Sequence, residues 1–464
     1  AQTEPSCSRM NTQLSVGKDL QSSRLLEDMR LHDYDVPFYH LDITASNASI
    51  ELSGSVRILA SVVADGMSEF VVELADELGV SEVKVDGVNA GYSQVNDLVN
   101  ISLDRVYLKD ELIDLRISYG GIPPLGDGFF QGIQSTTAPE WNQRVTWTLS
   151  EPFNARDWWP VKQVLTDKAD SAYIYITVPD GQRAGASGIL HDVKDVGSGQ
   201  VQYQWRTNKP IAYYLISLAI SEYTEYSTEV NLPGVSEPVE ILNYIYNNPA
   251  ALSEYKELMD GVGDQLLLFS DLFGTYPYAD EKYGHAMAPM GGGMEHQTMS
   301  TMSTFTFRLI AHELAHQWFG DRITCATWSD IWINEGFARY SEYLALEFLV
   351  NRANADAWMN LLQDNVISQP NGSVFVPELM AKDPYRIFNG RLTYNKGGAI
   401  LHTLRYLIDD DELFFQAMQN YADAFADETA TGSDFRDFMA QETGKSLNRF
   451  FDEWYLSLIH ISEP

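Results

Sequence analysis

Two histidines and a glutamate stand at helical spacing in the segment His312-Glu313-Leu-Ala-His316. Residues four apart lie on one face of an α-helix, so both imidazoles can hold one metal ion. Glu313 between them can reach a water molecule on such an ion. Glu335, in the later motif N-E-G-F-A, can supply a third ligand. Three protein ligands leave the fourth position to water, which is typical of catalytic zinc sites.

This donor set predicts hydrolysis of an amide bond. A zinc ion would lower the pKa of its water towards 7 and polarise a substrate carbonyl. Glu313 would take the proton of the water as general base and pass it to the leaving nitrogen. The motif does not tell cleavage at a chain end from cleavage in the middle. The alternative is an ordinary helix with two surface histidines.

Helices are the elements that must position these residues. Apolar residues recur at helical spacing over 304–320, where Ser303 or Thr304 can cap the start and Gly320 can end the segment. We therefore expect one amphipathic helix there. A second helix, over 334–350, would pack against it. The same period predicts further helices over 249–273, 353–366, 395–408, 412–425, 433–442 and 447–455.

Residues 37–220 show strand patterning instead, with alternating apolar and polar residues separated by turns such as Val85-Asp-Gly87. We expect a multidomain α+β fold, with an N-terminal β-rich domain over 1–224 and a mainly helical catalytic domain over 225–455. The boundary rests on the change of period alone. A strand is expected over 239–246 and a leading helix over 20–31.

The composition limits the partners. Among 464 residues, 65 are acidic and 31 basic, so the formal charge is -34. A field of this sign repels nucleic acids and anionic membranes. The sequence contains no run of about twenty apolar residues, so it predicts no transmembrane helix. Cys7 and Cys325 have no metal-type spacing, so we predict neither a disulfide nor a redox role.

The two ends of the sequence carry weaker expectations. The chain opens at Ala1 without an initiator Met, which fits a mature secreted protein and equally a trimmed fragment. We expect a secreted location, extracellular or periplasmic. Residues 456–464 look like a translated sequencing adapter, so we expect a non-native tail there and no function for His460.

A glycine-rich stretch precedes the metal motif. Gly292, Gly293 and Met294 predict a strand whose bare backbone lets a peptide approach and pair along it. Glu295 would then project towards the substrate's terminus. A free α-amine has a pKa near 8, so carboxylates in a partly dry pocket would select it. The alternative is a loop with a solvated glutamate.

Four motifs in order resemble those of the gluzincin zinc aminopeptidases, of the aminopeptidase N and leukotriene hydrolase type. They are G-G-M-E-H at 292–296, H-E-L-A-H-Q-W-F-G-D at 312–321, N-E-G-F-A at 334–338 and Y-N-K-G at 394–397. The resemblance covers nearly all of the chain. It implies a saddle-like β domain, a thermolysin-like catalytic domain and one Zn2+ per chain. The family's C-terminal helical domain would be absent.

The resemblance also implies three site residues. Glu295 matches the glutamate that binds the substrate's N-terminal amine, and Tyr394 matches the tyrosine that stabilises the tetrahedral oxyanion, as a preorganised donor beside a metal can. Glu151, in T-L-S-E-P-F-N-A-R, matches a second amine anchor that the β-rich domain lends to the site. From the residues alone, Tyr394 would be read as core and Glu151 as solvated.

The sequence departs from the family pattern at three positions. Leu149 replaces a glutamine, His296 an asparagine and Asp321 another asparagine. We expect His296 to be a structural, backbone-bonding group; the alternative is that it tunes the pH dependence near its pKa of about 6.5. Asp321 is expected to hold a turn or a neighbouring helix, and Leu149 leaves the shape of the first subsite open. Glu342, two turns beyond Glu335, is a candidate partner that orients a histidine. Structural roles are expected for His285, His402 and Cys325.

The favoured hypothesis is a zinc aminopeptidase acting on peptides with a free N-terminus. A thermolysin-like endopeptidase would use the same three ligands but has no reason to place acids at the subsite edge. A non-catalytic scaffold would gain nothing from an open metal position. An epoxide hydrolase side activity is implied by the resemblance alone. The sequence tells neither the preferred N-terminal residue nor the oligomeric state.

Overall fold

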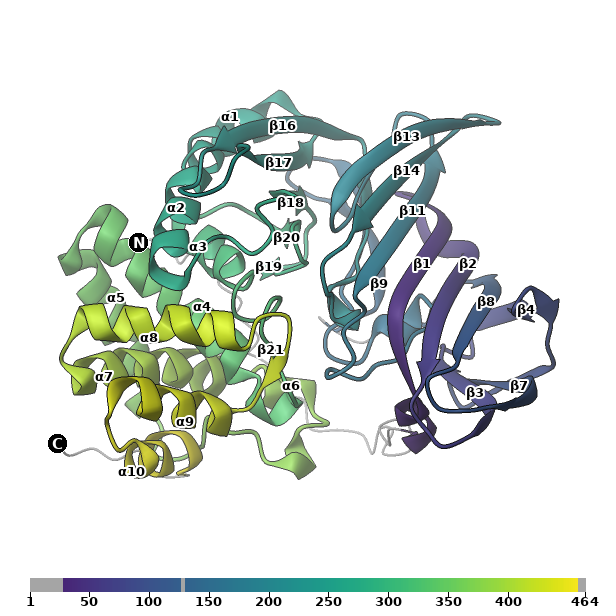
Figure 1. Cartoon of the computed structure of the whole chain (residues 1–464). Coiled ribbons are helices and arrows are strands. Elements are labelled where there is room, and N and C mark those ends of the chain that lie inside the picture. The colour runs from purple at the N-terminus through teal and green to yellow at the C-terminus, as the bar shows by residue number, and fades with distance from the viewer. Residues whose placement is uncertain (1–27, 127–129, 458–464) are drawn as a thin grey trace.

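The computed structural model describes residues 28–126 and 130–457. A β-rich N-terminal part and a mainly helical C-terminal part lie side by side (Figure 1). The predicted multidomain α+β fold is confirmed. Most of the expected leading helix over 20–31 lies outside the described residues. The described part of the chain begins with a 3₁₀ helix, Met29–Asp33.

The N-terminal part is built on an eight-stranded sheet. Strand β1 (Tyr34–Ser46) alternates buried and solvent-facing residues, which is the period-2 pattern of a half-buried strand. Pro37 lacks an N–H, and the pairing of β1 with β2 shifts register between Asp35 and Phe38. In spatial order the strands are β13 (Ile189–Gly197), β14 (Gln200–Thr207), β11 (Ser171–Pro179), β1 (Tyr34–Ser46), β2 (Ser49–Val62), β8 (Leu112–Gly121), β4 (Leu78–Val85) and β5 (Val88–Asn89).

Two smaller sheets complete this part. One consists of β3 (Met67–Glu73), β7 (Leu98–Tyr107) and β6 (Tyr92–Val95). The other consists of β12 (Arg183–Gly185), β15 (Ala219–Ser221), β10 (Gln143–Thr148) and β9 (Ile133–Ala138). Strand β10 matters for function because Glu151 follows three residues after its end.

The second part opens with a mixed five-stranded sheet. Its order is β16 (Tyr223–Val230), β17 (Val239–Tyr246), β18 (Tyr283–Met287), β20 (Ser300–Met302) and β19 (Gly293–Met294). The change of sheet between β15 and β16 falls close to the boundary expected near residue 225. Strand β19 is an edge strand, as a peptide-pairing strand must be.

Helices make up the rest of this part. Gly261 divides the single helix expected over 249–273 into two. Among the described residues, no helix is long and apolar enough to span a bilayer. The helices are α1 (Pro249–Asp260), α2 (Val262–Phe273), α3 (Phe307–Ala315), α4 (Trp332–Ala345), α5 (Arg352–Ile367), α6 (Pro384–Ile387), α7 (Gly397–Ile408), α8 (Asp411–Ala424), α9 (Gly432–Thr443) and α10 (Asn448–Phe451). Wider π-type turns occupy Leu346–Val350, Gly390–Lys396 and Asp452–Leu456, and β21 (Thr324–Cys325) pairs with β22 (Thr429–Ala430).

The metal-motif helix, α3, is shorter than expected. It starts at Phe307 because the side chain of Thr306, in place of Ser303 or Thr304, accepts the capping hydrogen bond from the backbone of Leu309. It ends at Ala315, so His316 is the C-cap residue and not an interior one. The expectation of one helix over 304–320 was therefore wrong at both ends.

Candidate active site

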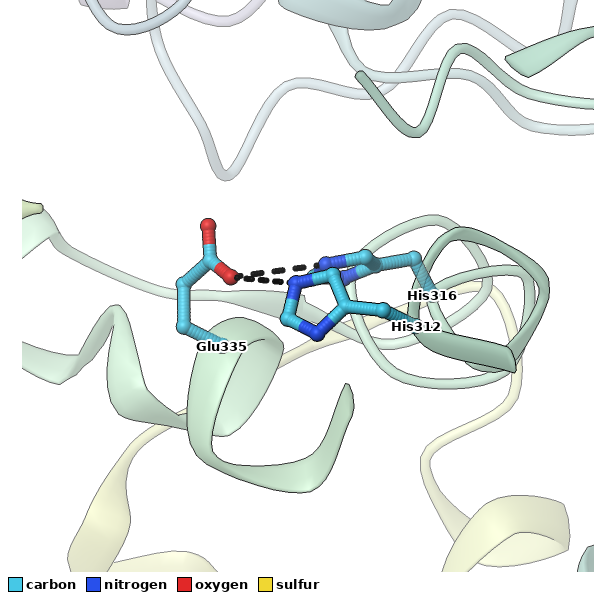
Figure 2. A group of neighbouring side chains, drawn as sticks. All are labelled: His312, His316 and Glu335. Atoms are coloured by element: carbon cyan, nitrogen blue, oxygen red, sulfur yellow. Dashed lines mark hydrogen bonds and ion pairs between the residues drawn. The ribbon is translucent and has the colours of Figure 1, made fainter. Parts of the chain in front are cut away.

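Three predicted metal ligands converge between α3 and α4 (Figure 2). The Oε2 atom of Glu335 lies 3.2 Å from Nε2 of His312 and 3.4 Å from Nε2 of His316. All three side chains are buried. Glu335 sits in the first turn of α4, which packs against α3 and brings its carboxylate to the histidine pair.

The outer nitrogens of both imidazoles are held by acceptors. Nδ1 of His312 lies 3.0 Å from Oε1 of Glu342, and Nδ1 of His316 lies 3.0 Å from the carbonyl oxygen of Phe319. A carbonyl and a carboxylate only accept, so both Nδ1 atoms carry hydrogen. Each Nε2 can then present its lone pair to a metal. Glu342 therefore orients His312 through this contact, which is the role expected for it.

The charge around these ligands fits a cation. Burial alone would lower the pKa of His316, but Glu295 and Glu335 raise it to about 10. The cluster therefore favours positive charge at its centre. Two neutral imidazoles and one carboxylate are the ligand types that zinc prefers. The residues present thus fit a divalent metal with an open position.

Glu313, next to His312 on α3, lines the same pocket. It is fully buried, and burial raises its pKa to about 7. A carboxylate with this pKa can gain and lose a proton near neutral pH, as a general base must. A Cβ atom on Gly293 would lie 2.2 Å from Oε1 of Glu313, so only glycine at this position leaves the carboxylate in place.

Tyr394 reaches the metal ligands from the turn before α7. Its hydroxyl donates a hydrogen bond of 2.8 Å to Oε1 of Glu335. Its ring lies nearly parallel to that of His312, with centroids 6.0 Å apart. Tyr394 thus lies beside the predicted metal ligands, where the resemblance to the family implies it should lie.

Glu151 and Glu295 form the opposite wall of the pocket. One carboxylate oxygen each of Glu151, Glu295 and Glu335 lies within 4.8 Å of the others. The Oε1 atoms of Glu151 and Glu295 are buried and have no hydrogen-bond partner among the described residues. Burial and the nearby Glu295 raise the pKa of Glu151 well above its usual value, and burial raises that of Glu295. Nδ1 of His316 lies 3.9 Å from Oε1 of Glu295, too far for a hydrogen bond, so a further cationic group can bind between the two carboxylates.

Gln317 ties the amine-side glutamate to the metal helix. Its side-chain amide donates to the carbonyl oxygen of Glu295 at 3.3 Å, and its Oε1 accepts from the backbone N–H of Thr298 at 2.8 Å. Gln317 directly follows the ligand His316. These two bonds fix the segment that carries Glu295 relative to the ligand His316. Gln317 could not be predicted as a site residue from the sequence, because a glutamine at a helix end carries no acid–base or metal-binding chemistry of its own.

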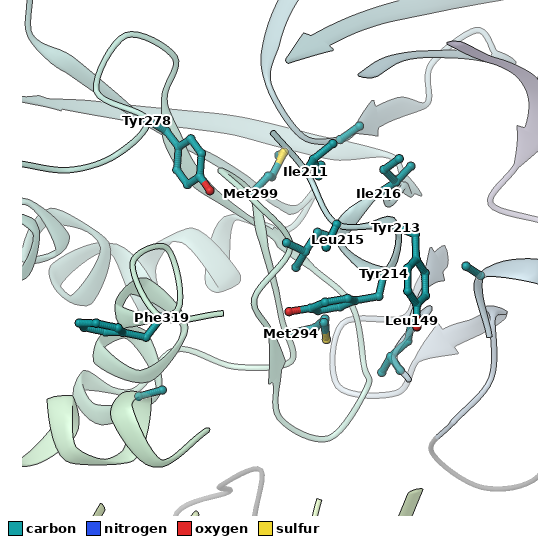
Figure 3. Close-up of a cluster of buried hydrophobic side chains, with 14 of the residues drawn as sticks. Leu149, Ile211, Tyr213, Tyr214, Leu215, Ile216, Tyr278, Met294, Met299 and Phe319 are labelled. Atoms are coloured by element: carbon teal, nitrogen blue, oxygen red, sulfur yellow. The ribbon is translucent and has the colours of Figure 1, made fainter. Parts of the chain in front are cut away.

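Glu151 comes from the other domain, across an apolar interface. Figure 3 draws Leu149 and Tyr214 of the N-terminal part in one cluster of buried hydrophobic side chains with Met294 and Phe319 of the catalytic part. Polar contacts cross it as well, since Tyr214 donates to the carbonyl oxygen of Gly320. Leu149 packs in this interface, is 1% exposed and does not line the small cavity between the metal ligands and Glu313.

A cavity of about 20 Å³ lies between these groups, enough for about one water molecule. Every predicted site residue except Gly292 lines it, together with the unpredicted Phe130 and Phe388. Gly292 instead uses its carbonyl oxygen to accept two hydrogen bonds from Ser303. A larger cavity of about 920 Å³, bordered by Trp328 among others, contains none of the predicted site residues.

The departures from the family pattern lie behind the pocket. Nδ1 of His296 pairs with the hydroxyl of Thr301, not with the backbone, and burial lowers its pKa to about 3, so it stays neutral. The backbone N–H of Asp321 bonds the carbonyl oxygen of His316, but its carboxylate has no hydrogen-bond partner among the described residues. The expected turn-holding role thus falls to its backbone. None of the three residues expected to be structural lines the pocket: His285, His402 and Cys325.

Comparison with known proteins adds a family match. Residues 292–454 match the model of the Peptidase family M1 domain. Probable aminopeptidase 1 of Sulfurisphaera tokodaii is 25% identical over 395 residues, which cover 81% of this chain and 48% of that protein. The chain thus spans about half the length of this relative.

Solved structures share the whole two-part architecture. The M1 zinc metallopeptidase from Deinococcus radiodurans has a TM-score of 0.81 at 24% identity, covering 93% of this chain and 95% of that one. A mutant of that protein bound to a Tyr-Ser-Ala substrate gives a TM-score of 0.80 at 25% identity, with the same coverage. The resemblance to the gluzincin zinc aminopeptidases is confirmed.

Proposed function

We propose that this chain, whose residues 292–454 match the model of the Peptidase family M1 domain, is a zinc-dependent aminopeptidase that hydrolyses the first peptide bond of peptides with a free N-terminus. The observation that carries the proposal is the pair of buried, unpartnered oxygens on Glu151 and Glu295 beside the metal ligands. A protonated amine donates three hydrogen bonds and would bring both a positive charge and hydrogen-bond donors to these oxygens. An endopeptidase substrate has no such group at this point.

The amine pocket also sets the reacting bond. With its ammonium group between Glu151 and Glu295, a substrate places its first carbonyl towards Glu313 and Tyr394, which line the same small cavity. The edge strand β19 offers backbone groups along which the peptide can pair. Anchoring one end in this way fixes the reacting carbon, which is the main advantage of a bound substrate over a free one.

His312, His316 and Glu335 would hold zinc, which supplies a Lewis acid that polarises the carbonyl and lowers the pKa of water. Glu313 accepts a proton as the water oxygen bonds the carbonyl carbon. It then delivers this proton to the nitrogen as the C–N bond breaks, so the products are one amino acid and a shortened peptide. The hydroxyl of Tyr394 can donate to the oxyanion.

The comparisons support this proposal. Probable aminopeptidase 1 of Sulfurisphaera tokodaii carries the activity in its name, and the structural neighbour from Deinococcus radiodurans is described as a zinc metallopeptidase with a tripeptide substrate. For this chain we propose the same aminopeptidase activity, a bound zinc ion and peptide substrates. The high negative charge gives no support to nucleic acid as a partner.

Paired peptides test the proposal. The purified protein is incubated with a set of free tripeptides and their N-acetylated forms, before and after zinc removal by a chelator. We expect release of the first amino acid from free peptides only, loss of activity on chelation and recovery with added zinc. Equal cleavage of acetylated peptides would indicate an endopeptidase. Absence of hydrolysis together with absence of zinc binding would indicate a scaffold.

A further inference from the structure

Arg339 is a buried cation beside the site that the proposed reaction does not use. It lies on α4, one turn after Glu335, and is 2% exposed. Two of its side-chain nitrogens, Nε and Nη2, have no hydrogen-bond acceptor among the described residues. We propose that Arg339 is a positioning residue that fixes the metal-side glutamate Glu342 and the oxyanion donor Tyr394 together. This inference rests on the proposed function.

The first contact leads to the metal ligand. Nη1 of Arg339 donates a hydrogen bond of 2.7 Å to Oε1 of Glu342. The same oxygen accepts from Nδ1 of His312 at 3.0 Å. Arg339 therefore holds in place the carboxylate that orients His312. Residues that orient a metal ligand in this way typically contribute 10- to 100-fold to metal affinity.

The second contact leads to Tyr394. The guanidinium carbon of Arg339 lies 5.5 Å from the centroid of the Tyr394 ring and 5.8 Å from that of Trp358. These distances are in the range of cation–π attraction, which is strongest where water is excluded. A positive charge at the ring draws electron density from the phenol, which makes its hydroxyl a better hydrogen-bond donor. The hydroxyl of Tyr394 is the group that faces the metal ligands.

Close helix packing keeps these groups in register. A Cβ atom on Gly397 would lie 2.9 Å from the Cα atom of Gly336, so the backbones of α7 and α4 touch here. A Cβ atom on Gly398 would lie 3.0 Å from Cγ of Arg339. Tyr394 precedes these glycines by one turn. The contact therefore leaves little freedom for Tyr394 to move relative to Arg339.

A neutral side chain would fill this space at lower cost. Burying a charge is unfavourable unless its partners compensate, and a methionine of similar length has no such penalty. The contacts of its positive charge with Glu342 and with the ring of Tyr394 therefore explain the buried guanidinium better than space filling does. Arg308, which lies 3.8 Å from Glu342 and 3.8 Å from the centroid of the Trp358 ring, adds a second positive charge to the same layer.

Three variants test the role of Arg339. Arg339→Met removes the charge, Arg339→Lys restores it, and Arg308→Met is the matched control that changes the other arginine at Trp358 and Glu342. Steady-state kinetics with a free tripeptide give kcat and KM, competition with a chromogenic chelator gives zinc affinity, and thermal unfolding reports folding. We expect Arg339→Met to lower kcat about 10- to 100-fold, leave KM within about threefold and weaken zinc binding about tenfold or more. Arg339→Lys should recover part of both losses, and Arg308→Met should change each by less.

A double mutant separates positioning from loss of fold. If Arg339 acts through Tyr394, Arg339→Met should reduce kcat much less in a Tyr394→Phe background than in the wild type. Wild-type kcat and zinc affinity in Arg339→Met, or no recovery in a folded Arg339→Lys, would overturn the inference. If the wild type hydrolyses no peptide, the proposed function fails, while the zinc competition still decides the link from Arg339 to His312.

Discussion

The two walls of the active site are built in opposite ways. On the metal side, His312, His316 and Glu335 come from neighbouring helices of one domain, and the outer nitrogens of both imidazoles have acceptors. On the amine side, Glu151 and Glu295 come from two domains, and each has a buried oxygen without a hydrogen-bond partner among the described residues. The imidazoles of one wall have acceptors for their outer nitrogens, and the carboxylates of the other wall have oxygens that can still accept hydrogen bonds.

This difference shows what each wall is for. A ligand set that is oriented before the metal arrives binds it tightly and keeps it through many turnovers. A buried carboxylate pair without a cation is unfavourable by itself and becomes favourable when an ammonium group enters. Under the proposed function, the amine wall gains energy when the ammonium group of the substrate binds, and this gain would select peptides with a free N-terminus. Mutations on the two walls should accordingly change different kinetic quantities.

The largest effect is expected for Glu313, which stands between the two walls. Glu313→Gln keeps the shape of the side chain but removes its ability to take a proton. We expect kcat to fall by about 10⁴-fold, the upper end for general base catalysis, with zinc stoichiometry unchanged. Kinetics and metal analysis of the same preparation check this. Loss of zinc together with activity would show that Glu313 belongs to the metal wall instead.

The next effect is expected for Tyr394, on the metal side. Tyr394→Phe removes the hydroxyl that can donate to the oxyanion and leaves the ring beside His312. We expect kcat to fall about 10²- to 10³-fold, with KM changed by no more than a few fold, because the contact forms only as the reaction proceeds. A large rise in KM at constant kcat would instead assign Tyr394 to ground-state binding.

The amine wall should respond in KM and not in zinc affinity. Glu295→Gln removes one negative charge at nearly constant shape, and Glu151→Gln is the matched change on the other domain. Each should lower kcat/KM for free peptides about 10- to 100-fold, as the loss of one charge-assisted hydrogen bond predicts. A free peptide and its acetylated form are compared in both variants. An equal loss for the two peptides would mean that these glutamates do not bind the free N-terminal amine.

The same contrast explains which parts of the site the sequence could predict. Helical spacing alone brings His312, Glu313 and His316 together, independently of the tertiary fold. The sequence therefore predicted the metal wall. Glu151 and Glu295 are joined only by tertiary packing. No local pattern links them, and resemblance to a family was needed.

The misses have the same physical cause. Thr304 and Thr306 are equally good capping residues, and local sequence does not decide which one starts α3. Arg339 follows N-E-G-F-A and reads as a surface cation, but α5 and α7 cover it. Phe388 enters the pocket through packing alone. The domains and their order were predictable because strand and helix periods differ over long stretches.

The smallest effect concerns the interface that brings Glu151 to the metal side. Lys168 of the β-rich domain donates to the backbone carbonyls of Asp321 and Arg322, both at 2.8 Å, in the turn after the metal helix. Burial lowers the pKa of Lys168 to about 8 from 10.5. Between these values the unfolded chain binds a proton that the folded chain does not, so this lysine adds to stability as pH rises through the window. Below about pH 8 both states are charged and the unfavourable burial is fully present.

We therefore expect the stability of the wild type relative to Lys168→Met to be constant from pH 6 to 7 and to rise by roughly 1–3 kcal/mol between pH 8 and 10. Urea unfolding of both proteins across this range measures the difference. A difference that falls with pH would mean that the charged form of Lys168 is the stabilising one. Because Lys168 touches no metal ligand side chain, zinc affinity should stay constant in the variant. A coupled loss of zinc would show that the metal wall depends on the domain interface as much as the amine wall does.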